Sequence, residues 1–146
     1  MNMNLQGIKR FVWAGAGAAA IVLAGCAGMS SHMGVQVTLS GANEVPPVAT
    51  SASGSGMIMV DADKSVSGSV TTMGVDGVAA HIHTGASGAN GPVTIGLTKT
   101  ADNVWSLPAG TKFTDEQYNT YKARGMYINV HSAANKGGEI RGQLMP

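Results

Sequence analysis

Three of the four histidines in this sequence lie in two short stretches with the composition of β-strands. His81 and His83 belong to the stretch 80–83, and His131 ends the stretch 127–131. In a strand, alternate side chains point to the same face, so His81 and His83 place two imidazoles on one face, about 7 Å apart at the backbone. A neighbouring strand that carries His131 completes a set of three. The spacing therefore predicts a metal site on the face of a sheet.

Neutral imidazole is a common ligand of copper and zinc, and three imidazoles on rigid strands leave one coordination position open. Copper is the expected ion because it stands highest in the affinity order of divalent metals for nitrogen sites, and zinc is the second candidate. The fourth ligand is unassigned. His32 and Met33 are candidates, since a thioether favours Cu(I), but the favoured alternative is that they are disordered tether residues and bind no metal. The alternative is that the histidines only form hydrogen bonds and hold no metal.

The strands that must position these histidines are short runs of alternating or apolar residues, separated by Gly, Ser, Asn and Asp. The stretch 51–56 is expected to be a flexible loop before one of them. About seven strands are predicted in this way, over residues 35–39, 57–61, 66–72, 78–83, 93–97, 126–131 and 139–144. The strand spacing is typical of an all-β sandwich or barrel.

One helix is expected, because residues 114–117 form a capping box and helical spacing continues to Lys122, with Gly125 as its stop. Its tyrosines, Tyr118 and Tyr121, are expected to pack on the sheets.

Met57 and Met59 share one face of a predicted strand. We expect them to fill gaps in the core, and the alternative is a patch that binds a soft metal.

The N-terminal residues resemble a secretory signal. Lys9 and Arg10 precede an apolar run over 11–23 that ends in small residues. The run is short for a membrane span, which needs about 20 apolar residues. The expected organisation is a cleaved signal peptide over 1–25, a flexible tether over 26–34 and one domain over 35–146.

Residues 23–26, Leu-Ala-Gly-Cys, resemble the bacterial lipobox, in which the cysteine becomes the lipidated first residue. The resemblance implies a lipid anchor on Cys26 and a place in the bacterial cell envelope, facing the periplasm. Ala27 is not acidic, which favours the outer membrane. The alternative is an ordinary signal peptide with a passenger cysteine.

The cysteine count and the charge balance limit the possible bonds and partners of the chain. Cys26 is the single cysteine, so no intramolecular disulfide can form. Loss of Lys9 and Arg10 with the signal changes the basic count from 9 to 7 against 8 acidic residues, and the formal charge from +1 to −1. This balance argues against nucleic acid as a partner.

Four motifs in the same order resemble the chordin-domain (CHRD) family: Leu-Ser-Gly-Ala-Asn-Glu-Val-Pro-Pro-Val, Ala-His-Ile-His-Thr-Gly with Gly-Ala-Asn-Gly-Pro-Val, Tyr-Ile-Asn-Val-His-Ser, and Gly-Gly-Glu-Ile-Arg-Gly-Gln-Leu. They lie at 39–48, 80–85 with 88–93, 127–132 and 137–144. The resemblance implies a β-sandwich found in secreted proteins, and by itself it implies no enzyme activity.

A fainter resemblance is to copper/zinc superoxide dismutases, which use a His-x-His strand pair, a later Val-His and an arginine near the C-terminus on a Greek-key sandwich. Together the two resemblances imply an all-β Greek-key β-sandwich, superoxide-dismutase-like, with one short helix. His81 and His83 match the pair, His131 the later histidine, and Arg141 the arginine. The bridging histidine, the zinc-site histidines and the disulfide are missing here, so the resemblance implies a copper-only site. Arg141 and Glu44 are candidates to support the metal ligands, and for Glu44 a structural ion pair with Arg141 is the favoured alternative.

Three functions remain open from the sequence. The first is an exported, lipid-anchored domain that binds copper for storage, tolerance or delivery. The second is a copper-only oxidoreductase that dismutes superoxide, with Arg141 steering the anion. The third is an envelope structural or interaction domain that holds no metal.

Overall fold

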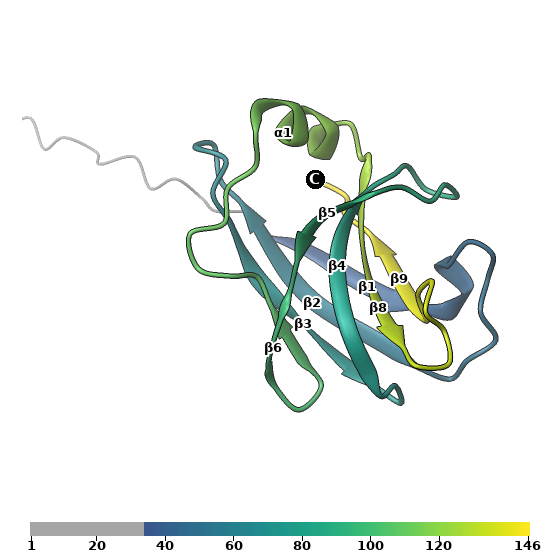
Figure 1. Cartoon of the computed structure of the whole chain (residues 1–146). Helices are drawn as coiled ribbons and strands as arrows, with labels where there is room; N and C mark the ends of the chain where they lie inside the picture. Colours follow the sequence, from purple (N-terminus) through teal and green to yellow (C-terminus); the bar gives the residue numbers. More distant parts are fainter. Residues whose placement is uncertain (1–33) are drawn as a thin grey trace, which may run out of the picture. The chain divides into compact units, whose positions relative to one another are not determined.

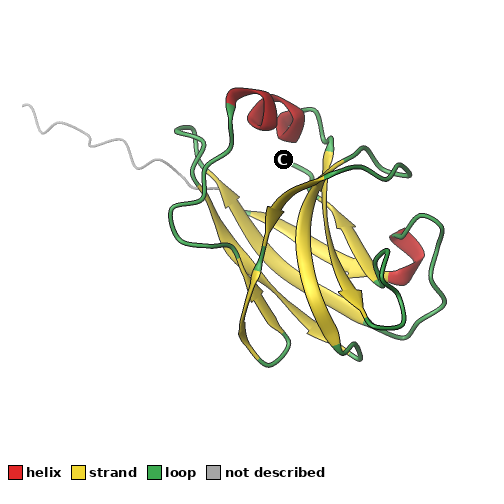
Figure 2. Cartoon of the chain, in the orientation of Figure 1, coloured by secondary structure: helices red, strands yellow, loops and turns green. Residues whose placement is uncertain are grey.

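A computed structural model describes residues 34–146. The predicted signal peptide, Cys26, His32 and Met33 lie outside the described residues. The described part is built almost wholly from β-strands, with one α-helix and one 3-10 turn (Figures 1 and 2). No helix in residues 34–146 is long and apolar enough to cross a membrane.

The strands follow one another along the chain with short connections. They are β1 (Val35–Ser40), β2 (Ser53–Val60), β3 (Val66–Met73), β4 (Gly77–Thr84), β5 (Val93–Gly96), β6 (Thr98–Ala101), β7 (Val104–Ser106), β8 (Met126–Ser132) and β9 (Ile140–Gln143). The 3-10 turn η1 (Gly41–Asn43) follows β1, and the helix α1 (Asp115–Lys122) precedes β8.

All strands belong to one antiparallel sheet, in the order β5-β4-β8-β9-β1-β2-β3-β7-β6. The two ends of this order, β5 and β6, are consecutive in the chain and are separated only by Leu97. β5 pairs with β4 and β6 pairs with β7, while the Leu97 amide donates to Ala80 O at 2.9 Å. The sheet is therefore nearly closed, which leaves little exposed strand edge.

One hydrophobic core lies inside the closed sheet. Alternation of side chains gives each strand one inward row, and the rows from both halves of the sheet meet in a single cluster. Fully buried members include Leu39, Ile58, Val70, Ile82, Ile128, Val130 and Ile140. Burial of each such side chain stabilises the fold by about 1.5–3 kcal/mol before entropy is counted. The all-β prediction is confirmed.

The prediction that residues 51–56 form a loop is wrong, because β2 begins at Ser53. Gly56 belongs to the strand, and a Cβ there would lie 2.1 Å from Ser69 O and 2.7 Å from Val70 Cα. Glycine is needed in this strand where β2 and β3 approach each other closely, so a Gly/Ser composition typical of loops here marks a tight strand pair. The strands β6 and β7 were also missed. β6 is largely polar and exposed, and β7 has only three residues, which is too short to show an alternating pattern.

The prediction that Met57 and Met59 fill the core is wrong. Their side chains are 47% and 37% exposed, whereas Ile58 between them is fully buried. Because the side-chain period of a strand is two, a choice of Ile58 for the core places both neighbours outside.

The helix prediction is confirmed. Gln117 N donates to the Thr114 hydroxyl at 3.2 Å, and Thr114 N donates to Gln117 Oε1 at 2.8 Å, which together form a capping box. Tyr121 is buried and Tyr118 packs against the core, as expected. The left-handed residue that ends the helix is Arg124, with φ 60°, one position before the expected Gly125.

Candidate metal centre

The candidate site lies on the face of β4, β8 and β9 that points away from the core. Ile82 and Ile128 point into the core, so their neighbours along each strand point outward. The β4–β8 pairing places Ala79 opposite His131, His81 opposite Asn129 and His83 opposite Tyr127. His81, His83 and His131 therefore share one outer face, as the sequence predicts.

The three histidines come close enough to hold one ion. Taking one nitrogen from each ring, all three lie within 4.8 Å of one another. His81 Nδ1 lies 3.0 Å from His131 Nε2. Two nitrogens bound to one ion at about 2.0 Å lie roughly 2.8–3.3 Å apart when the angle between them is 90–109°. The 81–131 pair already has this separation, and the ligand nitrogen of His83 lies within 4.8 Å of both.

Backbone carbonyls fix the orientation of two of these rings. His83 Nδ1 lies 2.9 Å from Gly91 O, and His131 Nδ1 lies 2.9 Å from Lys136 O. A carbonyl oxygen only accepts, so both Nδ1 atoms carry the proton and both Nε2 atoms present a lone pair. His131 Nε2 then accepts from His81 Nδ1–H across the 3.0 Å contact. His83 Nε2 is buried and has no hydrogen-bond partner.

The site favours neutral imidazoles. Burial lowers the pKa of His81, and the neighbouring His131 and His83 lower it further. Burial also lowers the pKa of His83, against the opposing effect of its hydrogen bond to Gly91. Neutral rings keep the lone pairs that metal ions need.

The loop over residues 85–92 positions the carbonyl that holds His83. Gly91 N donates to the Tyr127 hydroxyl at 3.3 Å, while Gly91 O accepts from His83. A Cβ at Gly91 would lie 1.6 Å from Thr84 O, so only glycine allows the loop to approach β4 this closely. The glycine in this motif therefore places a hydrogen-bond acceptor for an imidazole.

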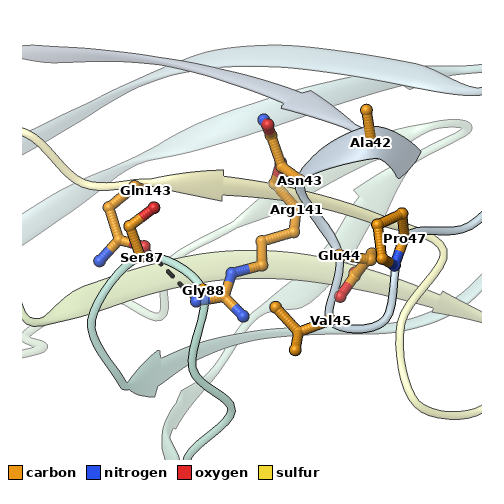
Figure 3. A pocket seen from close by; sticks show the side chains of 9 residues that line it. All are labelled: Ala42, Asn43, Glu44, Val45, Pro47, Ser87, Gly88, Arg141 and Gln143. Carbon is orange, nitrogen blue, oxygen red and sulfur yellow. Dashed lines mark hydrogen bonds between the residues drawn. The ribbon is translucent and has the colours of Figure 1, made fainter.

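The Arg141 side chain of β9 also holds this loop, through hydrogen bonds from its guanidinium. Its guanidinium lies between residues 42–47 and 87–88 (Figure 3). One terminal nitrogen donates to Ala86 O at 3.0 Å and to Ala89 O at 2.9 Å. The other donates to Asn90 Oδ1 at 3.3 Å. The side chain is only 1% exposed, so its donors serve the loop and are not open to solvent.

Tyr127 links Arg141 to the histidines. The guanidinium carbon lies 3.4 Å from the centre of the Tyr127 ring, and the same ring stacks on His83 with centroids 4.8 Å apart and planes 6° apart. Because β8 lies between β4 and β9, Tyr127 lies between His83 of β4 and Arg141 of β9. This stack restricts the tilt of the His83 ring.

Glu44 lies near Arg141, but the hydrogen bonds of the guanidinium go to the loop and Gln143. The attraction between the two charges is therefore at longer range than the predicted ion pair. Burial raises the pKa of Glu44, and Arg141 and the Asn129 side chain act against that rise. Its Oε1 is buried without a hydrogen-bond partner.

Asn129 was not predicted from the sequence. It lies on β8 between Tyr127 and His131 on the same outer face, and it is 1% exposed. Its Oδ1 has no hydrogen-bond partner. The signal was available, because a residue two positions before a ligand on one strand must share the face of that ligand.

The open side of the histidine cluster is a shallow hollow with a volume of about 420 Å³. His81 and His131 form part of its lining, with the exposed side chains of Val78 and Val93 at its rim. This hollow gives an ion or small ligand a path to the imidazoles, whereas the side of His83 is covered by the 85–92 loop.

The family model of the CHRD domain matches residues 35–144. The match covers well over half of the chain, so the chain belongs to the CHRD domain family, as predicted from its motifs. Neither the curated proteins nor the solved structures contain a match to this chain. The resemblance to copper/zinc superoxide dismutases stays a prediction.

We predict that the metal-free protein loses stability as the pH falls below about 6.5. His81 and His83 have a pKa below the unfolded value of about 6.5. The unfolded chain therefore takes up protons first, and the free energy of unfolding decreases as the pH falls through that range. Urea unfolding at intervals from pH 7.5 to 5.5 measures this slope, and His83→Leu reduces it. A free energy of unfolding that rises toward pH 5.5 contradicts the assignment of neutral rings.

We predict that Arg141→Lys weakens the site through the loop. Lysine cannot reproduce the stacked, planar fork that reaches Ala86, Ala89 and Asn90. The free energy of unfolding should decrease by about 2–4 kcal/mol, measured by urea denaturation at pH 7.5. Arg124→Lys is the matched control, because Arg124 is exposed, and its effect should stay within about 0.5 kcal/mol. Equal stability of the two variants would rule out a structural role of Arg141.

Proposed function

We propose that this CHRD-domain protein is an exported copper-binding protein that holds one ion with His81, His83 and His131, for storage, tolerance or delivery. The observation that carries the proposal is the convergence of three imidazole nitrogens within 4.8 Å. Two of the lone pairs are aimed by backbone carbonyls, as is usual for histidine ligands.

Metal binding explains the unpartnered nitrogen. Buried polar atoms nearly always have a hydrogen-bond partner, and an orphaned one costs about 1–3 kcal/mol. His83 Nε2 is buried and without a partner. In a domain with a purely structural role this nitrogen would only destabilise the fold, whereas a bound cation would supply its missing partner.

Copper is favoured over zinc on the chemistry of the donor set. Three neutral nitrogens form a site in which the divalent affinity order places copper above zinc. Since the single cysteine, Cys26, is the proposed lipid attachment point, no thiolate from this chain competes for the ion.

The geometry favours binding over superoxide dismutation. An arginine that steers an anion must offer free donors beside the open position. Arg141 is buried, and its hydrogen bonds go to the 85–92 loop and Gln143. Copper-loaded protein is therefore expected to show superoxide loss near the rate of copper-free buffer.

We predict that one equivalent of Cu(II) binds, and that His81→Ala and His131→Ala each weaken binding more than about 100-fold. Each substitution removes one ligand nitrogen, so the loss of affinity should exceed the 10–100-fold cost of losing a residue that only supports a ligand. Isothermal titration of metal-free protein measures the Kd, and elemental analysis measures the ion content after growth with copper and zinc.

Val78→Ala is the matched control, because Val78 lies at the rim of the same hollow and supplies no nitrogen. His32→Ala is a second arm that tests the tether histidine. Copper binding that survives His81→Ala unchanged, or a preference for zinc at equal concentrations, would overturn the copper proposal.

We also propose that the protein is attached to the envelope by a lipid on Cys26, facing the periplasm and with the outer membrane favoured. The lipobox-like residues 23–26 behind a charged and apolar segment support this. Labelled palmitate should enter the protein in cells, and Cys26→Ala should abolish labelling and release the protein from the membrane fraction. Unlabelled protein that still sediments with membranes would contradict lipid attachment.

A further inference from the structure

Asn129 lies at the centre of the outer face that carries the histidines. It is directly opposite His81 in the β4–β8 pairing and two residues before His131 on β8. Its side chain is 1% exposed, although the face on which it lies points away from the core. A buried amide in this position must satisfy both its donors and its acceptor.

The surroundings determine which end of the amide faces the histidines. Nδ2 lies 3.5 Å from Gly137 O. A Cβ built on Gly138 would lie 2.6 Å from Asn129 Nδ2 and 2.3 Å from Glu44 Oε1, so the amide nitrogen and the carboxylate oxygen converge on one spot. Acceptors therefore surround the nitrogen end, and the amide assignment follows from this network.

The oxygen end is left without a donor. Asn129 Oδ1 and His83 Nε2 are both buried, and neither has a hydrogen-bond partner. The two side chains are diagonal neighbours on the outer face, since Asn129 lies opposite His81 and His83 is the next residue of β4 on that face. His83 Nδ1 carries its proton toward Gly91 O, so Nε2 has none to offer the amide. Two lone pairs thus face one space that no donor fills.

A bound cation satisfies two adjacent buried acceptors at once, as a bridging water also does, and the three imidazoles beside this space favour the cation. Resting on the copper site proposed above, we infer that Asn129 Oδ1 is the fourth donor to the ion held by His81, His83 and His131. The set is then three imidazole nitrogens and one amide oxygen, all from β4 and β8. His32 and Met33 of the N-terminal segment are not needed to complete it.

The oxygen donor has a chemical consequence. Oxygen is a hard ligand that suits Cu(II), whereas thioether sulfur selects Cu(I). Asn129 therefore biases the site toward the oxidised ion. The three imidazoles bind both oxidation states, so removal of the oxygen should weaken Cu(II) binding selectively.

The test compares Asn129→Leu, which removes the oxygen at similar volume, with Asn129→Asp, which keeps an oxygen in place. Thr72→Val is the matched control, because Thr72 is equally buried but lies on β3. For Asn129→Leu, the Kd for Cu(II) should rise about tenfold, while the Kd for Cu(I) stays within about threefold. A tenfold rise in the ratio of the Kd for Cu(II) to the Kd for Cu(I) corresponds to a rise of about 59 mV in the one-electron reduction potential.

Electron paramagnetic resonance separates the two claims. Wild-type protein and Asn129→Leu should both show coupling to three nitrogens, with different copper hyperfine values. Absence of three-nitrogen coupling in the wild type overturns the copper site itself. Three-nitrogen coupling with the same hyperfine values and the same Kd in both proteins overturns the role of Asn129 and leaves the histidine site standing.

Asn129→Asp keeps the inference testable if the leucine variant does not fold. A carboxylate oxygen in the same place binds Cu(II) more tightly than an amide, so its Kd should fall and its hyperfine values should change. Values equal to those of the wild type would place the ion away from residue 129 and overturn the inference.

Discussion

The hydrogen bonds from two imidazoles to backbone carbonyls are the constraint on which the site depends. Gly91 O and Lys136 O each accept a hydrogen bond from an Nδ1–H, so Nε2 of His83 and Nε2 of His131 carry lone pairs, and the second of these accepts from His81 Nδ1. Without these carbonyls the rings could rotate and exchange tautomers, and three histidines on a sheet would hold no fixed geometry. Arg141 and Tyr127 support the arrangement from beneath, because they hold the loop that supplies Gly91.

One structural rule, the two-residue alternation of a strand, gives the protein both of its layers. Ile82, Ile128 and Ile140 fill the core. The residues that alternate with them along β4, β8 and β9 form an outer polar layer, which the loops at 41–48 and 85–92 cover. His83 Nε2 and Asn129 Oδ1, which are buried without a hydrogen-bond partner, both belong to this outer layer. The core thus lies on one face of β4, β8 and β9, and the proposed metal site lies on the other.

The sequence predicted what depends on local pattern. The His-x-His spacing placed two rings on one face, the Val-His placed the third, and the Thr-x-x-Gln box placed the helix. It could not predict which of Ile58 and its methionine neighbours face the core, since a wholly apolar run has no alternation. Nor could it predict that Arg141 binds carbonyls rather than Glu44, or that Asn129 is buried among the histidines, because both depend on how the loops fold over the sheet.

The central claim is that loop carbonyls set the imidazole tautomers and so prepare the lone pairs for an ion. Long-range proton–nitrogen NMR of the histidine rings, recorded before and after one equivalent of diamagnetic Cu(I), tests it most directly. The account predicts a proton on Nδ1 of His81, His83 and His131 in the free protein. On addition of Cu(I), only His81 should change, with its proton moving to Nε2. A proton on Nε2 of His83 or His131 in the free protein, or no response to Cu(I), would contradict the account.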